Sequence, residues 1–178
     1  MLEVIKNCCD TTYLDMLKYA AQESNGWNLT YPLGYSFEDK HLKLTLIENE
    51  PVNELIAGMA MGLLIQIYNS KTESGVPASD LFYPEVLYCG ISVKDKHRND
   101  NPHTDHEDNS GIIKIFGLLN SNWNKKDGGA FIHGNETVDL KPTNFVIFDP
   151  RITHHADKIT THEKRVGIDF TVKRKNNV

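Results

Sequence analysis

Apolar residues recur at helical spacing near the start of the chain. Within residues 10–22, Leu14, Leu17 and Ala21 are three or four positions apart, which is the spacing of one helix face. Asp10 is a favourable N-cap, because its side chain can accept a hydrogen bond from a free backbone N–H of the first turn. The pattern therefore predicts a helix over residues 10–22.

A second helix is predicted over residues 51–70. Pro51 suits the first turn, where a missing backbone N–H costs no hydrogen bond. The expected apolar stripe consists of Leu55, Ile56, Met59, Leu63 and Ile67. Each of the two helices thus has one apolar stripe, as expected for helices that cover a sheet.

The remaining apolar segments are short and typical of β-strands. Residues 41–47 alternate apolar and polar side chains, which is the period of a half-buried strand. A loop is expected at residues 74–84, where Gly75, Pro77 and Pro84 interrupt the chain. Further strands are predicted at residues 85–93, 111–119, 130–133, 137–140, 144–148 and 165–172. Several short strands separated by turns indicate a sandwich or barrel.

Two other segments are predicted to be irregular. Residues 31–37 contain Pro32 and Gly34 and are expected to form a loop or a sheet edge. Residues 173–177 are strongly polar, so we expect them to be a solvated tail.

Length and composition favour one domain. The chain has 178 residues, of which 39% are hydrophobic, and this suffices for one sizeable core. We expect a single domain over residues 1–178, with N-terminal helical support in residues 1–73 and a β-rich core over about residues 84–172.

Net charge and cysteine content bear on possible partners and on the redox compartment. The net charge of -5 lacks the basic footprint of a nucleic-acid-binding domain, which argues against nucleic acid as a partner. The three cysteines, Cys8, Cys9 and Cys89, are an odd number, and adjacent cysteines rarely bridge each other. This favours a reducing compartment.

The apolar segments also argue against export and membrane insertion. Residues 1–6 lack the features of a secretory signal. The longest mostly apolar run, residues 55–68, is interrupted by Gly58, Gly62 and Gln66 and is shorter than the roughly 20 residues that a spanning helix needs. We expect a soluble cytoplasmic protein without a membrane segment.

Candidate metal ligands lie in the second half of the chain. His103 and Asp105 are two positions apart, so on an extended segment their side chains point to the same side. His154 and His155 follow about fifty residues later. One further imidazole would complete a face of two histidines and one carboxylate, which suits iron(II) and leaves coordination positions open.

Several motifs in this region occur together in one known family. They are residues 102–105 (PHTD), 119–123 (LNSNW), 127–131 (DGGAF), 140–148 (LKPTNFVIF), His154 and Arg165. In this order and spacing they resemble the iron(II)/2-oxoglutarate-dependent oxygenases, specifically the prolyl 4-hydroxylase-like branch. The resemblance covers about residues 84–172 and implies a mainly β fold, the double-stranded β-helix or jelly roll of cupin-like proteins, with the N-terminal helices on the larger sheet.

The resemblance implies a role for each of these residues. His103, Asp105 and His154 would be the metal ligands, with His155 as the alternative to His154. Ala156 favours His154, because family members often have a small residue two positions after this ligand. Successive strand residues face opposite ways, so both histidines cannot readily bind one ion.

Three further positions concern the cosubstrate. Arg165 would hold the distal carboxylate of 2-oxoglutarate, since a guanidinium binds a carboxylate in a bidentate way. Tyr88 would belong to the same pocket, with a core aromatic residue as the alternative. Lys114, Phe116 and Leu118 should share the inner face of their strand, where Lys114 is interpreted as a solvated lysine rather than a carboxylate partner.

The implied activity is that of a 2-oxoglutarate-dependent dioxygenase. Its cofactors would be Fe(II), 2-oxoglutarate and O2, with ascorbate as an accessory reductant. The reaction would hydroxylate a C–H bond and release succinate and CO2. A prolyl residue of a peptide or protein is the first choice of substrate, followed by another protein side chain, a free amino acid or a modified nucleobase.

Two other functions are compatible with the same strands. A cupin-like metalloenzyme that does not use 2-oxoglutarate would not need Arg165. A non-catalytic jelly-roll binding module would need no metal at all.

Overall fold

The computed structural model describes residues 1–30, 41–97, 100–105 and 111–175. The loop or edge predicted at residues 31–37 lies outside these ranges. Antiparallel strands dominate the described part, and two helices accompany them. The expectation of a mainly β fold with supporting N-terminal helices is therefore confirmed.

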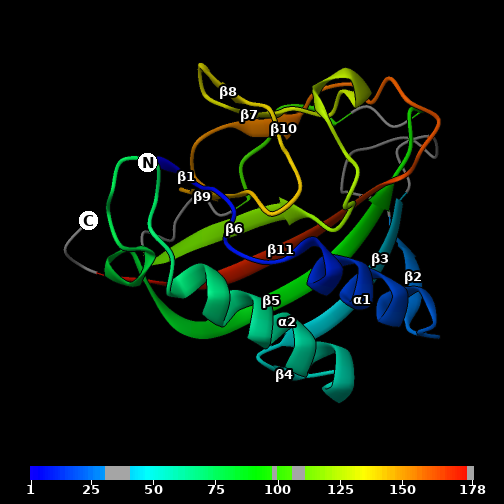
Figure 1. Cartoon of the computed structure of the whole chain (residues 1–178), viewed down its shortest axis with the longest axis horizontal. Coiled ribbons are helices and arrows are strands. Elements are labelled where there is room, and N and C mark those ends of the chain that lie inside the picture. The colour runs from blue at the N-terminus through cyan, green and yellow to red at the C-terminus, as the bar shows by residue number, and fades with distance from the viewer. Residues whose placement is uncertain (31–40, 98–99, 106–110, 176–178) are drawn as a thin grey trace.

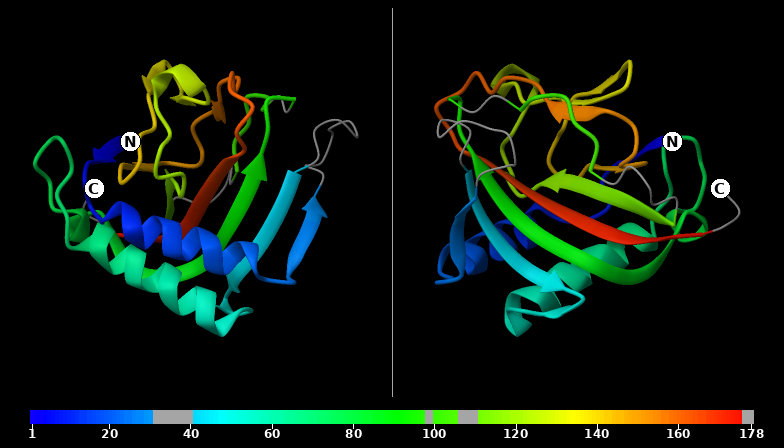
Figure 2. Two further views of the ribbon diagram at one scale, coloured as in Figure 1. Left: turned by 45° about the vertical axis from the view of Figure 1, so that its right-hand side comes forward. Right: turned by 180° about the vertical axis from the view of Figure 1, so that it is seen from behind.

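The strands form two sheets. The main sheet has the order β1-β9-β6-β11-β5-β3-β2, and β4 pairs with β3 at its margin. Its strands are β1 (Leu2–Ile5), β2 (Trp27–Thr30), β3 (His41–Glu48), β4 (Glu50–Pro51), β5 (Phe82–Lys94), β6 (Ile112–Leu118), β9 (Phe145–Phe148) and β11 (Arg165–Arg174). The small sheet has the order β10-β7-β8 and consists of β7 (Phe131–His133), β8 (Glu136–Val138) and β10 (His154–Ala156). Helices α1 and α2 cover one face of the main sheet, and the small sheet lies over the opposite face (Figures 1 and 2). We call this opposite face the inner face.

Helix α1 (Thr11–Gln22) matches its prediction. The Asp10 side chain accepts a hydrogen bond from the backbone N–H of Thr12, and Leu14, Leu17 and Ala21 are buried. These side chains pack into the core between the helices and the main sheet, which explains the apolar spacing in the sequence.

Helix α2 (Glu54–Tyr68) differs from its prediction at the start. Asn53 is its N-cap and accepts a hydrogen bond from the backbone N–H of Ile56, whereas Pro51 belongs to β4. Leu55 was expected in the apolar stripe but is 75% exposed. The buried residues are Ile56, Ala57, Ala60, Leu63, Leu64 and Ile67. Leu55 is thus outside the buried stripe, and the prediction was wrong at this position.

Side chains alternate across the main sheet. On β6, Ile113 and Ile115 pack with the helices, whereas Phe116 and Leu118 pack against a smaller core that includes Trp123 and Phe131. The prediction that Phe116 and Leu118 share the inner face is therefore confirmed. This smaller core joins the two sheets.

Several strands escaped the sequence patterns. Strands β1, β2 and β10 are three or four residues long, and each owes its extended form to a partner strand distant in sequence or to a hairpin. Residues 1–73 therefore contribute β1 to β4 to the main sheet as well as the two helices.

Two boundaries also need correction. Strand β5 begins at Phe82, and a short 3-10 helix at Ala78–Asp80 lies within the predicted loop 74–84. Strand β11 continues to Arg174, so the predicted tail does not begin at residue 173. Lys173 is paired with Ile112 of β6 and Arg174 with Phe82 of β5, so strand pairing extends into this polar end. No helix within the described ranges is long and apolar enough to cross a membrane.

Two of the leucines of α2, Leu55 and Leu63, provide a direct test of this packing. Leu63 has no exposed surface. Leu63→Ala should lower the free energy of unfolding by about 2–5 kcal/mol, because it removes buried methyl groups and leaves a cavity. Leu55→Ala, the matched control, should change it by no more than about 0.5 kcal/mol. Chemical denaturation measures both, and equal losses would contradict the observed orientation of α2.

Candidate metal centre

A pair of backbone hydrogen bonds brings the two halves of the centre together. The N–H of His103 donates to the carbonyl of His154 at 3.1 Å, and the N–H of His154 donates to the carbonyl of His103 at 2.8 Å. Two positions further, the N–H of Asp105 donates to the carbonyl of Pro150 at 3.0 Å. Residues 103–105 are therefore fixed to the chain around β10.

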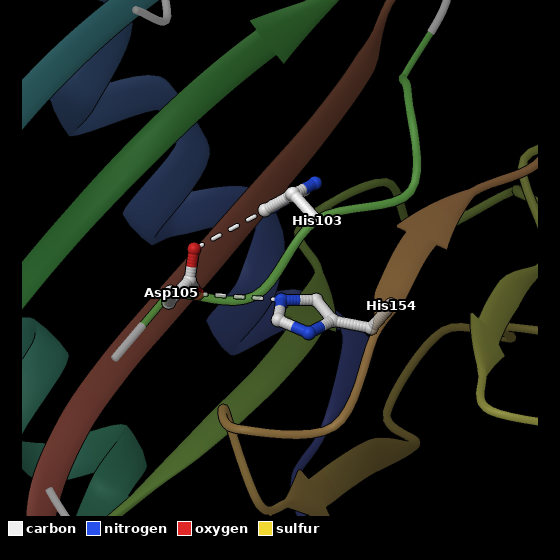
Figure 3. Close-up of side chains that lie close together, drawn as sticks. All are labelled: His103, Asp105 and His154. Carbon is white, nitrogen blue, oxygen red and sulfur yellow. Dashed lines mark ion pairs between the residues drawn. The ribbon is translucent and has the colours of Figure 1, made fainter. Parts of the chain in front are cut away.

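This pairing gathers the side chains of His103, Asp105 and His154 (Figure 3). One ligand atom from each lies within 4.8 Å of the others. The Nε2 atom of His103 is 3.5 Å from Oδ1 of Asp105, and Nε2 of His154 is 3.3 Å from Oδ2 of the same carboxylate. The arrangement offers two imidazole nitrogens and a carboxylate oxygen to one point, which is the donor set that suits non-haem iron(II).

Backbone carbonyls orient both imidazoles. Nδ1 of His103 lies 2.8 Å from the carbonyl oxygen of Asn101, and Nδ1 of His154 lies 2.8 Å from that of Ile152. A carbonyl oxygen only accepts hydrogen bonds, so each Nδ1 is the protonated nitrogen. In the neutral rings the lone pairs are then on Nε2 and point toward the centre, as in metal-binding histidines.

His155 does not join this group. It follows His154 on β10 and lies opposite Ile132 of β7, whereas His154 lies opposite His133. Successive residues of a strand face opposite sides, and His155 consequently points away from Asp105. The geometry thus favours His154 over His155 as the third ligand.

Aromatic side chains form a buried wall behind His154. Phe148 and Phe131 lie 4.8 Å and 6.0 Å from His154 between ring centroids. On the other side, the His103 side chain is 41% exposed. The centre is therefore dry at its back and accessible at the His103 side. Trp123 is buried, and its indole N–H donates to the carbonyl of Gly128 at 3.1 Å, so it is a packing residue.

Lys114 contacts two carboxylates, and its interpretation as a solvated lysine was wrong. Its Nζ is 2.7 Å from Oδ2 of Asp105 and 3.4 Å from Oδ2 of Asp169. Burial lowers the pKa of Lys114, but the charges of Asp169 and Asp105 outweigh this and raise it above its ordinary value. The ammonium is therefore charged at neutral pH.

Asp105 is ionised as well. Burial raises the pKa of its carboxyl, but contact with His154 and the charge of Lys114 hold it well below its usual range. The group therefore presents an anionic oxygen at neutral pH, as metal ligation requires.

Arg165 begins β11 on the inner face and is only 2% exposed. Its guanidinium carbon lies 4.9 Å from the centre of the Phe116 ring. Its Nε and Nη2 atoms have no hydrogen-bond partner among the residues that the structure describes. Burial lowers its pKa to about 10, against the opposing charge of Asp100, so it still carries a charge at neutral pH. A buried, charged and unsatisfied guanidinium is costly unless an anion pairs with it.

Tyr88 lies on the same face. A Cβ atom added at Gly90 would overlap its hydroxyl, so the ring extends along β5 over this glycine. The hydroxyl is buried and lacks a hydrogen-bond partner in the described part of the chain. Burial and the charge of Asp169 raise the pKa of Tyr88, which keeps the phenol protonated as a donor.

Asn120 was quoted in a sequence motif, but only the structure shows what it does. Its Oδ1 accepts the backbone N–H of Val166 at 2.7 Å, and its Nδ2 donates to the carbonyl of Lys164 at 3.0 Å. The two contacts lie on either side of Arg165 and fix the backbone from which the guanidinium extends.

Comparisons with solved structures place this geometry in a known fold. A prolyl-4-hydroxylase from Pseudomonas putida has a TM-score of 0.64 at 14% identity, over 98% of this chain and 92% of its own. HygX from Streptomyces hygroscopicus, solved with nickel and 2-oxoglutarate bound, has a TM-score of 0.65 at 9% identity, over 98% and 83%. A prolyl hydroxylase from Trichoplax adhaerens, in complex with a peptide fragment of hypoxia inducible factor, has a TM-score of 0.60 at 13% identity, over 97% and 83%.

The chain has the 2-oxoglutarate oxygenase fold. The expected jelly roll is confirmed with it. No family model matches the sequence, and neither does any curated protein. The oxygenase fold is thus established by the structural likeness.

The two hydrogen bonds of Asn120 on either side of Arg165, which we call the clamp, can be tested by mutation. Asn120→Ala should lower the free energy of unfolding by about 1–3 kcal/mol, because it leaves the N–H of Val166 buried without its partner. Asn122→Ala is the matched control in the same segment. Asn122 is exposed, and its hydrogen bond to Glu163 is long, at 3.4 Å. It should change stability by no more than about 0.5 kcal/mol. Equal unfolding midpoints for the two variants would contradict the clamp.

Proposed function

We propose that the protein is an iron(II)- and 2-oxoglutarate-dependent dioxygenase that hydroxylates a C–H bond, most favourably of a prolyl residue in a peptide or protein. The observation that carries this proposal is the buried Arg165 guanidinium, whose free donors face the same side of the main sheet as the triad. A metalloenzyme without an anionic cosubstrate has no use for such a group.

His103, Asp105 and His154 would hold the iron through two Nε2 atoms and one carboxylate oxygen. When bound, iron(II) with 2-oxoglutarate and O2 supplies the oxidation that puts one oxygen atom into a substrate C–H bond, with succinate and CO2 as the co-products. The protein contributes position and surroundings rather than an acid, base or nucleophile.

Arg165 would pair with the distal carboxylate of 2-oxoglutarate. Its ring neighbour Phe116 stacks on Phe131 at 6.2 Å, and Phe131 in turn contacts His154, so an unbroken aromatic layer connects the guanidinium with the metal centre. This layer excludes water from the pocket and strengthens the ion pair. Tyr88 would add a second donor to the same diacid.

The structural neighbours support the metal and the cosubstrate of the proposal, and in general a peptide substrate. HygX was solved with nickel and 2-oxoglutarate bound, which agrees with the donor set of this chain. The neighbours from Pseudomonas putida and Trichoplax adhaerens are prolyl hydroxylases, and the latter was solved with a peptide fragment. A peptide or protein partner therefore remains the first choice for this chain, in a reducing compartment that keeps iron in the ferrous state.

Metal affinity tests the choice between the two adjacent histidines. His154→Ala should weaken Mn(II) binding by more than about 100-fold, beyond the 10- to 100-fold that loss of an outer-shell partner costs. His155→Ala, the matched control one residue away, should bind nearly as tightly as the wild type. Titration followed by electron paramagnetic resonance measures the free ion. A larger loss in His155→Ala would contradict the assignment.

Turnover tests the activity itself. Incubation with Fe(II), 2-oxoglutarate, ascorbate and a panel of proline-containing peptides should yield succinate and a peptide with one additional oxygen atom, detected by mass spectrometry. Asp105→Ala should abolish both products, and Arg165→Met should raise the 2-oxoglutarate concentration needed for half-maximal rate. Oxygen added at another residue would overturn the prolyl assignment alone. Failure of 2-oxoglutarate to bind the metal-loaded protein would overturn the dioxygenase.

A further inference from the structure

We propose that Lys114 and Asp169 form a positioning pair that holds the Asp105 carboxylate in place beside the two metal-binding histidines. The inference rests on the metal site of the proposed function. It assigns a task to two residues outside the donor set, one on β6 and one on β11.

Lys114 and Asp169 belong to the main sheet, whereas the Asp105 carboxylate that Lys114 contacts lies outside it. Asp105 lies before β6, in no strand of its own, and its backbone is fixed by one hydrogen bond to Pro150. Lys114 and Asp169 lie on neighbouring paired strands at the centre of the sheet. Lys114 Nζ reaches both carboxylates, at 2.7 Å to Asp105 and 3.4 Å to Asp169. The ammonium thus links Asp105, which lies outside the strands, to the centre of the main sheet.

The contact fixes the Asp105 carboxylate beside the two imidazoles. Oδ2 accepts the hydrogen bond from Lys114 and lies 3.3 Å from Nε2 of His154, while Oδ1 lies 3.5 Å from Nε2 of His103. Each carboxylate oxygen is thus kept next to one of the two metal-binding nitrogens. A carboxylate that was free to rotate would lose this arrangement, and the donor set would have to be assembled when the ion binds.

Lys114 is a positioning residue and not a second anchor for the diacid. Its ammonium already contacts two carboxylates and its side chain is only 16% exposed. Arg165, in contrast, keeps two buried nitrogens without partners among the described residues. An incoming carboxylate would therefore pair with Arg165, and Asp169 neutralises the ammonium that would otherwise compete for it.

A charge-neutral double variant separates the effect of positioning Asp105 from the effect of charge on Mn(II) affinity. The double variant Lys114→Met/Asp169→Asn removes one positive and one negative charge, so the net charge of the centre is unchanged. We expect it to weaken Mn(II) binding by about 10- to 100-fold in the absence of 2-oxoglutarate. Lys43→Met is the control, because Lys43 also lies on the inner face but contacts the Tyr88 ring instead of the carboxylates. Its Mn(II) affinity should equal that of the wild type.

The single variant Lys114→Met provides an independent readout if the double variant does not fold. It makes the centre more negative, and charge alone would then strengthen binding of a divalent cation. Weaker Mn(II) binding supports positioning, and tighter binding overturns it. Lys114→Arg, which keeps the charge and both contacts, should restore most of the affinity. The thermal midpoint of each metal-free variant verifies that the compared proteins are folded.

The remaining outcomes are also decisive. Unchanged Mn(II) affinity in the folded double variant overturns the positioning pair while the metal site stands. Unchanged Mn(II) affinity combined with weaker 2-oxoglutarate binding would show that Lys114 is a cosubstrate ligand instead. A wild-type protein that binds no Mn(II) would overturn the metal site of the proposed function, and the positioning pair with it.

Discussion

The centre depends on two backbone hydrogen bonds between residues that are far apart in sequence. His103 and His154 exchange both of their N–H to carbonyl contacts, and these join an irregular segment to a three-residue strand of the small sheet. This pairing sets the two imidazoles side by side, and the hydrogen bond from the N–H of Asp105 to the carbonyl of Pro150 brings the carboxylate to them. The rest of the fold, with the small sheet over the inner face of the main sheet, keeps the pairing in place (Figure 2).

The inner face is unusual for the charge that it buries. Burial of an ion is costly unless a partner and hydrogen bonds compensate for it. Lys114 satisfies this condition through Asp105 and Asp169, whereas Arg165 does not satisfy it within the described chain. This contrast between a paired and an unpaired cation on the same face is the observation behind the proposal that Arg165 binds the cosubstrate. On that proposal, binding of the diacid would stabilise the folded protein.

Periodicity and local signals were sufficient for much of the fold. Helix α1 and strand β3 follow from their apolar spacing, because each buries one face, whereas β6 and β11 follow from their nearly continuous apolar character, because both of their faces are buried. Strands β1 and β10 could not be predicted in the same way, since a three- or four-residue segment is defined by its partner strand rather than by its own pattern. The error at Leu55 arose because Leu55 and Ile56 are adjacent apolar residues at the start of α2, and the sequence does not show which of them is buried.

In the candidate site, too, some residues could be selected from sequence motifs, whereas others required the fold. Spacing and motif order were enough to select His103, Asp105 and Arg165, whereas the choice between His154 and His155 required the register of β10 against β7. The partners of Lys114 were also inaccessible to sequence reasoning, because Asp105 and Asp169 approach it only through the fold.

A crystal structure of the protein with Mn(II) and 2-oxoglutarate bound would test the central claim most directly. The account predicts one ion held by Nε2 of His103, Nε2 of His154 and one oxygen of Asp105, with the distal carboxylate of the diacid on Arg165. An ion ligated by His155, or a diacid that leaves Arg165 without a partner, would contradict it.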